Sequence, residues 1–196
     1  MRFQSMTSRT PQRHDAGNQG IALLEFALIL PVLIIMAFGV IDFGRLIQTR
    51  LIISNVSREG GSVASRETAI DPNFLNLLIT SAKPLDLAGG DGKIMITRIV
   101  AGVSEEKPSP TIQDFYSAGG LGRGSIIGAD NLYLGLPMNL YNHLLFKPEN
   151  KTSDISEITV VEVYYRYRPI TPLPNFIEGI LMPDNGGLIV GSRAIF

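Results

Sequence analysis

The distribution of apolar residues divides the chain into a polar leader, a long apolar run and a mixed remainder. Residues 1–20 are mostly polar, and residues 21–41 form an almost uninterrupted apolar run. A stretch of about 20 apolar residues is long enough to span a bilayer as a helix. One acidic residue, Glu25, lies inside this run. A carboxylate in an apolar span is costly, and its presence therefore suggests a function.

A helical pattern continues beyond the apolar run. An apolar stripe at helical spacing comprises Leu46, Ile53, Val56, Val63 and Ala64. The pattern predicts one long helix from about Ile21 to Glu67, with a bend at Pro31, where a backbone hydrogen bond is lost. The pair Gly60 and Gly61 leaves two interpretations open. The helix either approaches a sheet or another subunit closely there, or frays near its end.

The remainder of the chain predicts a short helix followed by strands. Asp71 as a cap and Pro72 in the first turn favour a helix that runs through Leu78. Strands are predicted at Lys93 to Val103, Ile158 to Arg168 and Leu188 to Phe196. Such strands after a long helix favour an antiparallel sheet packed on that helix, an α+β arrangement. Residues 103–154 are predicted as a long surface insertion with a short helix near Leu136 to Phe146.

Three interpretations of the leader and the apolar run remain open. An ordinary signal peptide needs a small-residue cleavage site after its apolar core, and Asp42 to Arg45 offers none. A plain membrane anchor would keep its leader. Cleavage after Gly20 would instead make Ile21 the first residue and Glu25 the fifth. Cleavage after Gly17 is a competing possibility, but it would not leave the acidic residue in the fifth position.

The spacing of Ile21 and Glu25 suggests what such a cleavage would achieve. Residues four apart lie on the same face of a helix. The new amine of one subunit could therefore pair with the carboxylate of a neighbour, which would reduce the cost of holding an ion in an apolar medium. Arginine counts on the two sides of the apolar run are nearly balanced, so charge alone does not set the orientation of the anchor.

Composition argues against several classes of function. The net charge of −1 gives no general case for binding nucleic acid. The chain has no Cys, so disulfides, thiolate metal sites and Cys nucleophiles are excluded. The only two histidines, His14 and His143, form no credible triad or zinc site, and Ser125 only loosely resembles a nucleophile elbow. We expect no enzymatic activity, no metal and no cofactor.

Three stretches of the sequence carry a resemblance to a known family. They are Leu24 to Pro31 continued by Phe38 to Leu46, then Asn55 to Gly61, and finally Val161 to Leu173. These stretches resemble the TadE-like family of pilus assembly proteins. Members of that family are minor pilins, or pseudopilins, of the bacterial tight-adherence (Tad, Flp-type) pilus and secretion system. The resemblance implies a pilin-like fold with a domain outside the inner membrane.

The resemblance also assigns roles to individual residues. It implies that a prepilin peptidase cuts between Gly20 and Ile21. It further implies that Glu25, Phe26 and Pro31 belong to the segment that packs against neighbouring subunits. The expected partners are the prepilin peptidase, the Flp-type major pilin and other minor pilins, the inner-membrane pilus assembly platform and the lipid bilayer. Nucleic acid is not an expected partner.

The expected organisation follows from these assignments. The ranges are a cytoplasmic leader at 1–20, a transmembrane segment at 21–41, a helix continuation at 42–68, and an extracytoplasmic α+β domain at 69–196. The expected function is that of a structural minor pilin in the assembly or initiation of a Tad pilus and in adhesion, with incorporation into the extracellular pilus. The alternative is an unprocessed, membrane-anchored assembly or binding protein of the Tad apparatus.

Overall fold

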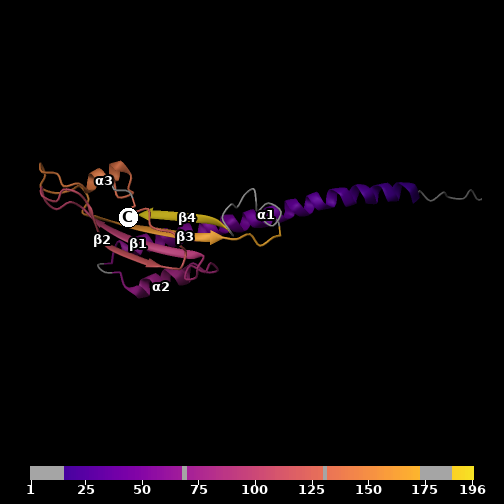
Figure 1. Ribbon diagram of the computed structural model, residues 1–196, viewed down its shortest axis with the longest axis horizontal. Coiled ribbons are helices and arrows are strands. Elements are labelled where there is room, and N and C mark those ends of the chain that lie inside the picture. The colour runs from indigo at the N-terminus through magenta and orange to yellow at the C-terminus, as the bar shows by residue number, and fades with distance from the viewer. Residues whose placement is uncertain (1–15, 68–69, 130–131, 173–186) are drawn as a thin grey trace, which may run out of the picture. The chain divides into compact units, whose positions relative to one another are not determined.

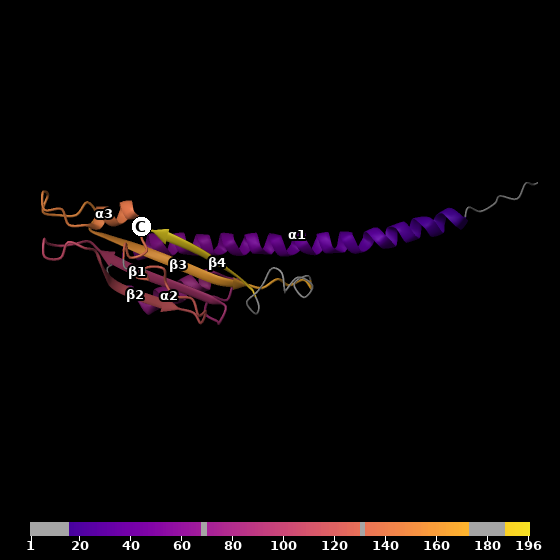
Figure 2. The same ribbon diagram turned by 45° about the horizontal axis from the view of Figure 1, so that its top comes forward.

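The computed structural model describes residues 16–67, 70–129, 132–172 and 187–196 (Figures 1 and 2). The chain divides between Ile41 and Asp42 into two compact units. The elements in chain order are α1 (Ala16–Ala64), α2 (Pro72–Ser81), β1 (Gly92–Val100), β2 (Thr111–Ala118), α3 (Met138–Leu144), β3 (Glu157–Tyr167) and β4 (Leu188–Ile195). The long helix and the strands confirm the predicted α+β class. The second unit contains all the elements other than the first part of α1.

The sheet is antiparallel throughout, with strand order β2-β1-β3-β4. Three of its strands lie where the sequence predicts them, although β1 ends at Val100 rather than Val103. The fourth strand, β2, is absent from the prediction because it lies at the sheet edge and buries little of its surface. A bulge between Arg98 and Ile99 interrupts its pairing with β1.

The second half of α1 and the helix α2 cover one face of the sheet. This core comprises Ile53, Val56 and Ala64 of α1, Leu75 and Leu78 of α2, and Ile94, Ile96, Val161 and Val163 of the sheet. The predicted stripe on α1 is therefore largely correct. Val63 is the exception, because it is 38% exposed.

The opposite face of the sheet is covered by the segment between β2 and β3, and Figure 1 shows α2 and α3 on opposite sides of the sheet. Ile127, Leu136 and Leu144 of this segment are buried against Ile158 and Val160 of β3. The predicted insertion at 103–154 thus contributes β2, α3 and a second apolar core to the domain. The helix α3 is shorter than the stretch predicted from Leu136 to Phe146.

The helix ends show how the sequence sets the boundaries of α1 and α2. Asp71 caps α2 as predicted, accepting from the backbone N–H of Asn73 at 3.0 Å, and this bond lowers the pKa of its carboxyl. The helix then continues past the predicted end to Ser81. α1 begins at Ala16, ahead of the predicted Ile21, and ends at Ala64.

The C-terminus of α1 is capped from the sheet. α1 has no basic residue in its last turn. The buried guanidinium of Arg98, on β1, instead donates to the carbonyl oxygens of Ala64 at 3.2 Å and Glu67 at 2.5 Å. A cation is favourable at this end because the helix dipole and the last carbonyl groups make it negative.

Candidate functional site

The first part of α1 presents an apolar surface to its surroundings. From Gly20 to Ile41 every residue except the half-buried Phe38 is exposed, with Ile21 at 68% and Phe26 at 57%. An exposed apolar surface of this extent marks contact with a membrane or with other proteins. α1 is long and apolar enough to cross a membrane. This long apolar N-terminal helix indicates single-pass membrane anchoring.

All the predicted processing and packing residues lie in continuous helix. Ile21 and Glu25 are one turn apart, and the helix passes through Pro31 without interruption. A Cβ atom added at Gly20 would meet nothing within 4 Å. Contacts inside the described part of the chain therefore do not explain the glycine at position 20. The roles predicted for these residues, including Phe26, concern partner molecules and stay predictions.

The structure reveals a hydrogen-bonded cluster at the start of the second unit, which we call the Asp42 clamp. One carboxylate oxygen of Asp42 accepts from the backbone N–H groups of Ile170 at 3.1 Å and Thr171 at 3.4 Å. The other oxygen accepts from the hydroxyl of Thr171. The backbone carbonyl of Asp42 accepts from the hydroxyl of Tyr167 at 2.9 Å, and burial raises the pKa of that hydroxyl. The clamp ties the end of β3 to α1.

The Asp42 clamp brings together the first and third of the three stretches for which the sequence predicts a TadE-like resemblance. Asp42 belongs to the first stretch, and Tyr167, Ile170 and Thr171 belong to the third. The sequence pattern by itself gives Asp42 no role beyond the start of the segment that lacks a signal-peptide cleavage site. The signal that could have identified it is the Pro-containing turn, whose free N–H groups need an acceptor. Its partner lies more than a hundred residues away, so local pattern could not find it.

Part of the second resembling stretch, Asn55 to Gly61, faces the sheet and α2. The hydroxyl of Ser57 is 2.8 Å from the hydroxyl of Ser192 on β4. A Cβ atom added at Gly60 would lie 2.9 Å from Leu78 of α2, and one at Gly61 would lie 2.3 Å from the Phe196 ring. The glycine pair therefore permits close approach within the same chain. This supports the first of the two interpretations given above.

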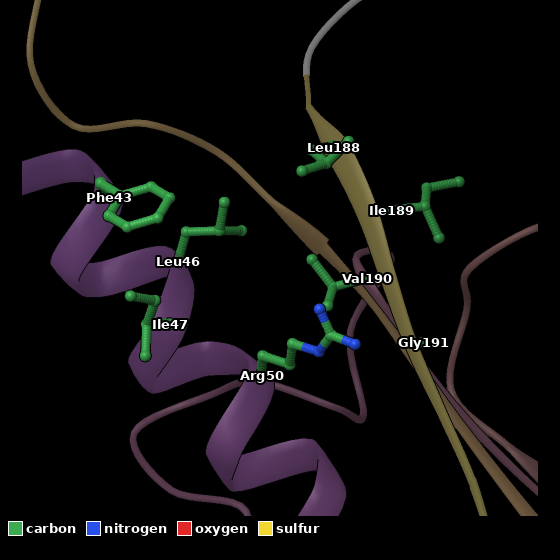
Figure 3. A pocket seen from close by; sticks show the side chains of 8 residues that line it. All are labelled: Phe43, Leu46, Ile47, Arg50, Leu188, Ile189, Val190 and Gly191. Carbon is green, nitrogen blue, oxygen red and sulfur yellow. The ribbon is translucent and has the colours of Figure 1, made fainter. Parts of the chain in front are cut away.

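An open groove lies between α1 and β4, with a volume of about 420 Å³. Its lining comprises Phe43, Leu46, Ile47 and Arg50 from the helix and Leu188, Ile189, Val190 and Gly191 from the strand. Figure 3 shows Arg50 reaching from the helix toward Val190. The groove lining among the described residues is mainly apolar with Arg50 as the one cation, so the groove suits contact with apolar groups better than polar catalysis.

A buried carboxylate holds the segment between β2 and β3 on the sheet. Glu162, which is fully buried, accepts from the Tyr164 hydroxyl at 3.0 Å, from the Ile126 backbone N–H at 3.3 Å and from the Ser125 hydroxyl. Burial, and secondarily the charge of Glu162, raise the pKa of Tyr164 to about 12. The guanidinium of Arg123 lies 5.5 Å from the centre of the Tyr164 ring. Ser125 thus serves as a hydrogen-bond donor to a structural acid.

His143 lies apart from this network. On α3, its Nδ1 atom is 2.7 Å from a carboxylate oxygen of Asp154, which also pairs with Lys147 at 2.5 Å. These hydrogen bonds, the one from Lys147 first, lower the pKa of Asp154. All three side chains are at least one-third exposed, as expected for a solvated surface cluster. The second histidine considered from sequence, His14, lies outside the described residues.

Comparison with known proteins finds one matching protein family. Residues 20–62 match the family model described as TadE-like protein. No curated protein and no solved structure is significantly similar to the chain. The matched range begins at Gly20 and includes Glu25, Asp42 and the glycine pair at 60 and 61. The chain therefore carries a TadE-like segment at residues 20–62, which confirms the predicted family resemblance over its first two stretches. The third stretch, Val161 to Leu173, lies outside the match, and its resemblance stays a prediction.

Proposed function

We propose that this protein is a structural minor pilin, or pseudopilin, of a Tad-type pilus, with a role in pilus assembly or initiation and in adhesion rather than catalysis. The observation that supports the proposal most is the extent of the TadE-like match. It begins at Gly20, the residue predicted to precede the cut, and continues to the contact of Gly61 with the end of the sheet. The matched range thus includes both the exposed apolar segment and the part of α1 that packs on the sheet domain.

In this proposal the chain is made as a precursor in the bacterial inner membrane. The segment from Ile21 to Ile41 crosses the membrane, and the sheet domain lies on the extracytoplasmic side. A prepilin peptidase removes residues 1–20. The mature protein then joins Flp-type major pilins and other minor pilins at the inner-membrane assembly platform.

Glu25 is the residue by which one subunit recognises its neighbour. Its carboxylate is exposed on an apolar helix segment, one turn from Ile21. Once cleavage frees the Ile21 amine, the amine of one subunit can pair with Glu25 of its neighbour. The pairing offsets part of the cost of holding both ions away from water, so a neighbour placed without it would be disfavoured. Phe26 and Pro31 lie on the same exposed segment and supply apolar contact.

The experiment that tests this role is the recovery of a Glu25→Ala variant in sheared pilus fractions. We expect Glu25→Ala to be cleaved and to reach the membrane but to be strongly depleted from the pilus fraction. Glu59→Ala is the matched control, because Glu59 is an exposed acid on the same helix outside the apolar segment. Incorporation of Glu25→Ala at the wild-type level would show that the pairing role is wrong.

A second candidate function is that of an unprocessed, membrane-anchored assembly or binding protein of the Tad apparatus. One observation favours it. α1 begins at Ala16, so the peptide bond between Gly20 and Ile21 lies within a helix. A helical segment must open locally before a peptidase can hold its scissile bond in an active site. In this alternative the leader stays in place and the sheet domain recruits partners without entering a filament.

A further inference from the structure

The turn after β3 lies next to the residue where the apolar segment ends. Asp42 is bonded covalently to Ile41, the last residue of the apolar run. The backbone N–H of Ile170 donates to the Asp42 carboxylate at 3.1 Å, and Thr171 is bound to the same carboxylate. Ile170 is therefore hydrogen-bonded to the residue at which the chain would leave the apolar core of a bilayer. This relation holds at any tilt of the helix, because it depends only on the bond to Asp42.

The dimensions of a bilayer place this turn in the headgroup layer. The polar layer on each side of the hydrocarbon core is about 5 to 7 Å thick. A helix rises about 1.5 Å per residue, so the first four residues after Ile41 remain within this layer. Phe43 lies among them and is 64% exposed, and Ile170 on the neighbouring turn is 58% exposed. Among the described residues, two large apolar side chains thus lie more than half exposed at this level.

Basic side chains accompany these two apolar residues. Arg45 is exposed on the next part of α1. Arg168 precedes the turn, and its side chain is 59% exposed while it pairs with Asp91 at 2.8 Å. Long basic side chains at a membrane boundary place their stems against apolar groups and their charged ends among the lipid phosphates. The combination of exposed apolar and basic residues is typical of a surface that lies on a membrane.

We propose that Phe43 and Ile170 form a lipid-contact face that inserts into the headgroup layer, with Arg45 and Arg168 directed at phospholipid phosphates. The face continues directly from the membrane-spanning segment, and this continuity favours lipid over a protein partner. The Asp42 clamp holds the turn at that level. The proposal requires the membrane anchor but does not depend on a role in a pilus.

Tryptophan fluorescence tests the proposal, because the chain contains no tryptophan of its own. Three single variants of the full chain are reconstituted into phosphatidylcholine and phosphatidylglycerol vesicles with brominated acyl chains, which quench tryptophan on contact. Ile170→Trp reports on the proposed face. Leu33→Trp, in the middle of the apolar run, is the control for insertion. Val103→Trp is the control for an exposed apolar site beyond the opposite end of β1, at 69% exposure.

We expect Leu33→Trp to be quenched best by deeply placed bromines and Ile170→Trp best by shallow ones. Val103→Trp should be quenched severalfold less than Ile170→Trp. Adding Asp42→Ala to Ile170→Trp should reduce the quenching in a protein that keeps its β-sheet circular dichroism, because the turn is released.

Equal and weak quenching of Ile170→Trp and Val103→Trp, with Leu33→Trp still quenched, would overturn the lipid-contact face. Blue-shifted emission from Ile170→Trp that grows with the protein-to-lipid ratio, without quenching, would overturn it in favour of a second copy of the chain. The vesicles contain neither a prepilin peptidase nor other pilins. These outcomes therefore leave the proposed role as a minor pilin to be judged separately.

Discussion

Asp42 and Thr171, 129 residues apart in the chain, are joined by two hydrogen bonds, from the backbone N–H and the hydroxyl of Thr171 to the Asp42 carboxylate. Asp42 is the first polar residue after the apolar segment, and Thr171 lies in the turn after the longest strand. The residue that ends the apolar run is therefore also the residue that fastens the sheet domain to α1. A charged acceptor makes stronger hydrogen bonds than a neutral one, which favours aspartate here.

Replacing Asp42 with alanine should destabilise the sheet domain by about 2 kcal/mol, because two backbone donors and a hydroxyl lose a charged acceptor. Thermal unfolding of the full chain in detergent, followed by circular dichroism, measures the loss. Glu105→Ala, in an exposed loop, is the control and should unfold like the wild type. Equal unfolding temperatures for both variants would contradict the clamp.

Gly61→Ala should destabilise the protein although alanine favours helix by about 1 kcal/mol. The added methyl group would overlap the ring of Phe196, whose backbone is fixed by two hydrogen bonds to Thr159 at 2.8 and 3.0 Å. Strain of this kind typically costs about 1 to 3 kcal/mol. The measurement is the midpoint of urea unfolding.

Two further variants decide whether overlap with Phe196 is the cause of that loss. Gly44→Ala, at an open position of the same helix, should be neutral or stabilising. The double change of Gly61→Ala with Phe196→Ala should cost less than the sum of the two single changes, because the ring is no longer there to overlap. Simple additivity would show that the close contact is not the cause.

Arg98→Met should lower the free energy of unfolding by about 2 to 4 kcal/mol, because the C-terminal carbonyl groups of α1 lose a buried cationic donor. Hydrogen exchange should then accelerate in the last turns of α1, near Ala64, more than in α2. Arg58→Met, an exposed arginine on the same helix, should change stability by less than about 0.5 kcal/mol. Unchanged exchange near Ala64 would rule out the capping role.

Tyr164 should make the fold sensitive to alkaline pH. Its pKa in the folded protein is raised to about 12 from the ordinary tyrosine value of 10.0, so the folded state holds the proton more tightly than the unfolded state. The resulting stability is intact below pH 10 and is lost as the pH rises from 10 toward 12. Denaturant unfolding at a series of pH values should therefore show a shallower loss for Tyr164→Phe than for wild type over that window. Parallel curves would contradict the assignment.

Much of the architecture could be predicted because its signals are local. The apolar run, the cap at Asp71 and the β-branched residues of β3 each identify an element within a few neighbouring positions. The strand β2 escaped prediction because it lies at an edge, where polar residues such as Gln113 replace a strict alternation. Edge strands bury less surface and therefore carry a weaker pattern.

The contacts that organise the candidate site could not be predicted in the same way. Asp42 meets Thr171, and Glu162 meets Ser125, across long stretches of sequence whose spacing fixes neither pair. A single polar residue has many possible partners until the fold places one beside it. Glu25 differs, because its isolation within an apolar run is itself local, so sequence alone made it a candidate.

The proposed function depends above all on processing of this chain to a mature pilin subunit, which intact-mass spectrometry can detect. The full-length protein is purified from membranes after co-expression with an active prepilin peptidase, alongside a sample co-expressed with a peptidase lacking its catalytic residues. We expect a mature chain that begins at Ile21 only when the peptidase is active. A chain that keeps its residues 1–20 in both samples would show that it is not a processed pilin and would favour the unprocessed anchor.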